Sequence, residues 1–253
     1  MIDISFEFSL LLIALGFVAG IINTMAGGGS NLTLPALMVL GLPADVANAT
    51  NRVSVFFQSM TATRGFYKHG KLDMPDIKAV VAITIAGGLA GAFVASYLPV
   101  TYLKPTLLAT MIVMAAIILF KPSLISVPFG ELPKNVRTTP QSIPMLFIAG
   151  FYGGFVQAGV GFILIAAIAG SLRYDLARTN ALKIVCTAAF TSVALLIFIA
   201  RDQISWLPGL LLASGSILGA QIAVKITINI SQNALKWFLF VMTIFASLAA
   251  IMS

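Results

Sequence analysis

The chain has 253 residues, of which 59% are hydrophobic and 9% are charged, and its formal net charge is +7. This composition excludes an ordinary soluble domain, in which about 25% of residues are charged, and indicates a membrane protein that crosses the bilayer several times. The basic excess does not indicate nucleic-acid binding, because most lysines and arginines lie beside apolar runs, where they mark the cytoplasmic side of a membrane.

Apolar runs near or above the roughly 20 residues needed to cross the hydrocarbon recur along the chain. We predict membrane spans at residues 8–26, 77–98, 103–120, 143–158, 184–200, 207–224 and 234–252. A less uniform run, residues 46–65, also fits a span. Asp3 and Glu7 precede the first run, where a signal peptide would carry positive charge, so we expect that run to remain in the mature fold.

Glycine interrupts apolar stretches at corresponding places in the two halves of the chain. The glycines are Gly27, Gly28, Gly29, Gly159 and Gly161. Paired glycine-broken hydrophobic segments are the best sequence indication of a transporter's binding site. The alternative for each glycine is close helix packing through small residues, but packing alone does not require three consecutive glycines.

A short apolar segment follows each of these glycine breaks, at residues 32–40 and 162–169. Neither segment spans a bilayer alone, because a helix rises about 1.5 Å per residue. We therefore predict helices that are interrupted near the bilayer midplane. Such interruptions are tolerated only where the exposed backbone lines a cavity or is buried in protein.

Other elements also repeat in the same order in both halves. The repeated elements are Gly16 and Gly20 with Gly150 and Gly154, Thr50 and Asn51 with Thr179 and Asn180, and Gly88 and Gly91 with Gly215 and Gly219. We predict an N-terminal repeat at residues 1–121, an extramembrane linker at 122–140 that is rich in proline and charge, and a C-terminal repeat at 141–253.

The positions of basic residues predict how the two halves are oriented. Basic residues follow the span at 46–65 in the first half, whereas in the second half Arg173, Arg178 and Lys183 lie before the span at 184–200. An inverted pair would place them on one side of the membrane. The predicted fold is an all-α polytopic membrane protein with two homologous multi-helix halves as inverted repeats, with a parallel arrangement as the alternative.

The glycine-rich break, Pro35 after it, the repeated Thr-Asn pair and the Gly-x-x-Gly-Ala element at residues 88–92 resemble the TauE/SafE sulfite exporter family, also called TSUP. The resemblance covers nearly the whole chain. It implies a secondary transporter, in the export direction, of sulfite or small organosulfonate anions such as sulfoacetate. It places the substrate site at the two glycine breaks and the two Thr-Asn pairs.

Such an anion needs several hydrogen-bond donors and little negative charge around it. Exposed backbone N-H groups and the positive end of a half-helix supply part of this. The candidate side-chain donors are Asn23, Ser30, Asn31, Thr50, Asn51, Gln157, Thr179 and Asn180. The alternative role for the Thr-Asn pairs is helix capping or hydrogen bonding between helices.

Two basic residues lie just beyond the Thr-Asn pairs. Arg52 and Lys183 are candidates for drawing an anion toward the cavity. The alternative is that they extend to the membrane interface or pair with Asp45 and Asp175.

The acidic residues fall at the ends of predicted spans or in loops, which disfavours a cation pump. The sequence shows no metal-binding or phosphate-binding motif, and we expect no cofactor, no metal and no enzymatic activity. An anion channel of the same architecture is the alternative to a carrier, and a membrane enzyme or assembly factor is disfavoured. We expect a multi-pass protein of the cell inner membrane whose partners are the lipid bilayer and a small sulfur-containing anion, and a homodimer is a plausible assembly.

Overall fold

The computed structural model describes residues 5–72, 74–120 and 132–229. Within these ranges the chain is helical and contains no strand, which confirms the predicted all-α class. The helices are α1 (Phe6–Met25), α2 (Ser30–Val39), α3 (Ala44–Lys68), α4 (Ile77–Tyr97), α5 (Val100–Phe120), the 3-10 helix η2 (Val136–Thr138), α6 (Ser142–Phe155), α7 (Val160–Leu172), α8 (Leu176–Ala200) and α9 (Trp206–Asn229). The predicted span at 234–252 and residues 122–131 of the predicted linker lie outside the described residues.

Hydropathy located four described helices that are long enough to cross a membrane, although it missed the start of one of them. Among the described residues, α1, α4, α8 and α9 are long and apolar enough to cross a bilayer. Helix α8 begins at Leu176, whereas the sequence predicted a span only from residue 184. The missed turns contain polar side chains that are buried inside the protein, Thr179, Asn180 and Lys183. Their burial against other helices compensates for their low hydropathy.

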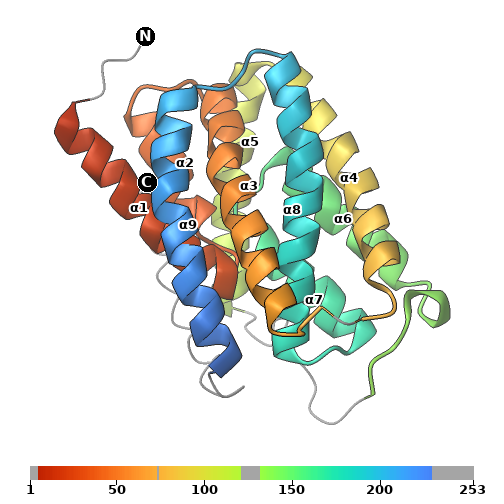
Figure 1. The fold of residues 1–253 in the computed structure, drawn as a ribbon. Helices are drawn as coiled ribbons and strands as arrows, with labels where there is room; N and C mark the ends of the chain where they lie inside the picture. The colour runs from red at the N-terminus through yellow and green to blue at the C-terminus, as the bar shows by residue number, and fades with distance from the viewer. Residues whose placement is uncertain (1–4, 73, 121–131, 230–253) are drawn as a thin grey trace.

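The helices are arranged so that each half of the chain packs against the other (Figure 1). Helices α3 and α8 lie in contact at the centre and run in opposite directions. Helix α1 of the first half packs along α9 of the second on one side, and α4 of the first half packs along α6 of the second on the other. Among the described helices, the two pairs with the most extensive contacts therefore each join one half to the other.

Glycines allow the two helices of each of these pairs to pack closely. A Cβ at Gly215 would collide with the backbone of α1 at Ile13, and one at Gly87 would collide with the backbone of α6 at Phe147. Because Gly87 and Gly215 make matching contacts, the structure corrects the predicted equivalence of Gly88 with Gly215 by one residue. Small residues allow helix backbones in a membrane to approach closely and gain van der Waals contact.

We expect Gly154→Ala to lower the thermal stability of the purified protein, because the added methyl would meet the backbone of α4 at Gly88. Overpacking of this kind costs about 1–3 kcal/mol. Gly170→Ala in α7 is the matched control, since a Cβ there meets no atom within 4 Å and alanine favours a helix. The two melting temperatures measure the contrast, and equal values would show that the α4–α6 contact is loose.

One end of the helix bundle collects basic loops from both halves. The Val136 N-H donates to the Asp76 carboxylate at 2.9 Å, and the Lys134 N-H donates to the Leu172 carbonyl at 2.8 Å. These bonds join the linker to the loop before α4 and to the end of α7. At the other end, the Gln203 amide contacts Asp45. The positive-inside rule predicts that the basic end is cytoplasmic.

Candidate functional site

Two helix breaks meet at the centre of the protein. Helix α1 ends at Met25 and α2 begins at Ser30, and α6 ends at Phe155 and α7 begins at Val160. The turns between them use left-handed backbone, with φ of 107° at Gly27, 69° at Gln157 and 73° at Gly159. The two breaks touch, because a Cβ at Gly27 would collide with the Gly161 backbone. Only glycine permits both the left-handed turn at Gly27 and this contact.

Side chains from α8 cap the broken end of α1. The Lys183 Nζ donates to the carbonyls of Asn23 and Thr24, each at 3.1 Å, and to the Asn180 Oδ1 at 2.7 Å. The Asn180 Nδ2 donates to the Met25 carbonyl at 2.9 Å. The last carbonyls of a helix have no partner within it and carry partial negative charge. A cation and an amide from the second half therefore satisfy the broken helix of the first half.

Side chains from α3 do the same for α6. The Arg52 guanidinium donates to the carbonyl of Gly153 at 2.8 Å and to that of Gly154 at 2.6 Å. The Asn48 Nδ2 donates to the Phe155 carbonyl at 3.0 Å. The guanidinium also donates to the Gln157 Oε1 at 2.7 Å. The capping is thus reciprocal, since each half supplies a cation and an asparagine to the broken helix of the other.

Both cations are removed from solvent and have no acidic partner among the described residues. Arg52 is 0% exposed and Lys183 is 1% exposed, and the oxygens that they contact are neutral. Asp175 instead pairs with Arg178 at 3.5 Å, and Asp45 accepts from Gln203 at 3.5 Å. The alternative prediction, that the two cations reach the interface or pair with Asp45 and Asp175, is therefore wrong.

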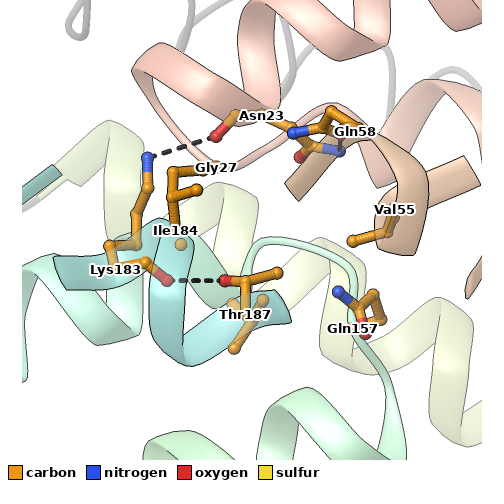
Figure 2. A pocket seen from close by; sticks show the side chains of 10 residues that line it. Asn23, Gly27, Val55, Gln58, Gln157, Lys183, Ile184 and Thr187 are labelled. Carbon is orange, nitrogen blue, oxygen red and sulfur yellow. Dashed lines mark hydrogen bonds between the residues drawn. The ribbon is translucent and has the colours of Figure 1, made fainter. Parts of the chain in front are cut away.

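A small cavity lies between the two breaks (Figure 2). It is lined by Asn23, Gly27, Val55, Gln58, Gln157, Val160, Gly161, Lys183, Ile184 and Thr187. Its volume is about 10 Å³, which is close to the space needed for one water molecule. The lining combines one cation with neutral polar and apolar groups, and the start of α7 contributes Val160 and Gly161. Such a set favours a ligand with hydrogen-bond acceptors and negative charge.

The amide groups around the cavity differ in how they are used. The Asn23 Nδ2 donates to the Gln58 Oε1 at 3.1 Å, and the Gln58 Nε2 donates to the Thr24 hydroxyl at 3.3 Å. The Gln157 Oε1 accepts from Arg52, but its Nε2 has no acceptor among the described residues. Figure 2 shows this nitrogen directed toward Thr187. Gln157 therefore presents a free donor to the cavity.

The structure divides the predicted site residues into three groups. Those that line the cavity are Asn23, Gly27, Gln157, Gly161 and Lys183. Those that bond to a lining residue are Gly29, Arg52 and Asn180. Those outside the lining are Gly28, Ser30, Asn31, Thr50, Asn51, Gly159 and Thr179. The predicted equivalence of the Thr-Asn pairs is not matched by their contacts.

The contacts of the two Thr-Asn pairs show the difference. Asn51 bonds to Ser30 and Thr33 at the start of α2, in its own half. Thr50 accepts from the Ser205 N-H just before α9, whereas Thr179 donates to the Tyr174 carbonyl. These bonds fit the capping and interhelical roles that the sequence left as the alternative. The residue that matches Asn180 by its contacts is Asn48.

The sequence reasoning missed Asn48, Gln58 and Thr187. Gln58 lies seven residues, or about two helical turns, after Asn51 on α3, and Thr187 lies four after Lys183 on α8. Residues at these spacings share a helix face. A search for polar residues on the same helix face as each candidate site residue would have found Gln58 and Thr187.

Comparison with known proteins places nearly the whole chain in one family. The family profile "Sulfite exporter TauE/SafE" matches residues 12–250. A Haemophilus influenzae protein named "Probable membrane transporter protein" is 26% identical, over 95% of this chain and 93% of that protein. The Escherichia coli K12 protein "Probable membrane transporter protein YfcA" is 29% identical, over 89% of this chain and 83% of its own length.

A Sinorhizobium protein, "Probable membrane transporter protein ORF9", is 25% identical over 96% of this chain and 92% of that protein. These matches extend through both halves, as the family profile does. Together with the apolar helices, they identify a multi-pass membrane protein. The chain belongs to the sulfite exporter TauE/SafE family of membrane transporters.

Proposed function

We propose that the protein is a secondary carrier that moves a small sulfur-containing anion, such as sulfite or an organosulfonate, across the cell inner membrane by alternating access. The observation that carries this proposal is Lys183, a fully buried cation that lines the central cavity and, among the residues that the structure describes, contacts only neutral oxygens. A charge at membrane depth is costly, so such residues are rare and mark substrate or ion pathways. A bound anion would supply the missing opposite charge.

The donors around the cavity suit a sulfur oxyanion. A sulfite or sulfonate group presents several acceptor oxygens on one compact head. The Gln157 amide nitrogen has no acceptor among the described residues and is the free donor at the cavity. Lys183 contributes positive charge while its ammonium donates to protein oxygens, and Gly161 near the start of α7 also lines the cavity. The N-terminus of a helix favours anions through its free N-H groups and its dipole.

We also propose that the two halves are inverted repeats and that alternating access moves one half against the other. Three observations support this proposal: the opposite directions of α3 and α8, the matching α1–α9 and α4–α6 pairs, and the reciprocal capping by Arg52 and Lys183. Broken helices that meet at a repeat interface near the midplane are typical of secondary transporters. The described conformation is closed, since its cavity has space for roughly one water molecule.

Counterflow in proteoliposomes tests the carrier. Vesicles loaded with unlabelled sulfite are placed in trace ³⁵S-sulfite, and we expect transient accumulation of label above its equilibrium level. Competition by thiosulfate, sulfoacetate, taurine, sulfate, acetate and chloride then defines the head group. We expect sulfite and the sulfonates to compete and acetate and chloride to fail.

Two results would contradict the proposal in different ways. If acetate and chloride compete as well as sulfite does, the protein is an anion carrier without specificity for sulfur compounds. Flux that does not saturate, accompanied by electrical conductance in planar bilayers, would instead identify the anion channel.

A further inference from the structure

We propose that Gln157 is the specificity-determining donor of the anion site and that Arg52 is its positioning residue. The inference rests on the proposed anion transport and adds the group that distinguishes an anion from other solutes. It assigns Arg52 a role that acts through Gln157, because Arg52 itself does not line the cavity.

The direction of the Gln157 amide is set by chemistry. A glutamine side chain can usually be turned over, since its oxygen and nitrogen are hard to distinguish. A guanidinium has only donors, so the group that it contacts at 2.7 Å must be the Gln157 oxygen. The amide nitrogen is then obliged to face the other way, toward the cavity side shown in Figure 2.

Arg52 is itself held firmly. Its guanidinium also donates to the carbonyls of Gly153 and Gly154, and it lies 4.9 Å from the centre of the Phe198 ring. A fork of donors fixed at several points has little freedom to turn. The amide that it orients therefore has little freedom either.

The backbone of Gln157 supports a functional role. Its φ of 69° lies in the left-handed region, where a residue other than glycine or asparagine is uncommon. Strained backbone of this kind gathers at ligand sites, where the surrounding structure maintains it. The conformation brings a long amide side chain into the break, where glycine would leave no donor.

A donor with a fixed direction selects the ligand by charge and hydrogen bonding. An ammonium or other cationic donor would face the Gln157 N-H group with no acceptor to offer, whereas an oxyanion accepts from it. A hydrogen bond to a charged group contributes more than one between neutral groups. The site thus admits acceptor-rich anions and rejects amines of the same size.

Anion binding to purified variants tests the proposal, with sulfite and the sulfur-free oxyanion nitrate as probes. Gln157→Met keeps the side-chain length and removes the donor, and we expect it to weaken anion binding about 10- to 100-fold. Gln203→Met is the matched control, because Gln203 lies between α8 and α9 and contacts Asp45 and Ser96 instead. We expect the control to change anion affinity less than about threefold.

Arg52→Lys separates positioning from a general structural effect. Lysine keeps the charge but loses the fork that fixes the amide, so we expect weaker binding in the native background. In the Gln157→Met background, the same change should leave affinity unaltered, because the amide is already absent. A structural role alone would weaken binding by the same factor in both backgrounds, and that result would overturn the positioning role.

The outcomes distinguish this inference from the proposed function. If nitrate binds and sulfite does not, the sulfur substrate is wrong, and loss of nitrate binding in Gln157→Met still supports the donor. If sulfite binds the native protein and the Gln157→Met protein equally, the donor role is overturned while the carrier stands. If no anion binds the native protein, both are overturned.

Discussion

Lys183→Met is expected to abolish sulfite counterflow and to weaken anion binding at least about 30-fold. The lysine supplies the charge that lines the cavity, and methionine has a similar length without charge or donors. The loss also leaves the carbonyls of Asn23 and Thr24 without the cation that caps them. Isothermal titration with sulfite and counterflow in proteoliposomes measure the two effects.

Lys225→Met is the control for this experiment. It removes the same formal charge from α9, but Lys225 is exposed rather than buried, so we expect transport close to that of the native protein. Gel filtration shows whether each variant is folded and monodisperse. A folded Lys183→Met protein that transports sulfite with native affinity would remove the central premise of the proposed carrier.

Arg52→Met should cause the largest loss of stability. The change leaves the carbonyls of Gly153 and Gly154 buried without their donors and takes one partner from the Gln157 amide. A buried acceptor that loses its donor costs about 1–3 kcal/mol, and this change affects more than one acceptor. We expect the apparent melting temperature in detergent to fall by on the order of 10 °C.

Arg178→Met provides the comparison. Arg178 pairs with Asp175 at 3.5 Å, but its side chain is 49% exposed, and an exposed ion pair contributes about 0–1 kcal/mol. We expect its melting temperature to remain within about 3 °C of the native value. A similar loss in both variants would mean that capping of α6 contributes little to stability.

Much of the fold followed from hydropathy and glycine. The helices α1, α4 and α9 coincide with predicted apolar runs within a few residues, and the helix breaks fall at the predicted glycines. The pairing of helices did not follow. A glycine face on a helix shows that another helix can pack closely against it, but it does not show which helix does so. The α1–α9 and α4–α6 pairs could therefore be identified only from the three-dimensional structure.

The site was predicted only in part, because which side chain reaches a neighbouring helix also depends on the three-dimensional packing. The predicted repeat paired Asn51 in the first half with Asn180 in the second. In the structure, the first-half residue that caps a broken helix as Asn180 does is Asn48. The shift arises because Asn48 and Arg52 are four residues apart, while Asn180 and Lys183 are three apart. Both spacings place two side chains on one helix face, so the two helices satisfy the same carbonyl pattern with different residues.

The exchange of helix partners between the halves has a consequence for synthesis of the protein. Helix α1 is made first, but its packing partner α9 begins about 200 residues later. At a ribosomal rate of about 5–20 residues per second, α1 waits roughly 10–40 s for that partner. During this interval its glycine face is covered only by lipid or by an insertion chaperone. A nascent chain stopped before α9 therefore leaves α1 unpaired and open to quality-control proteases.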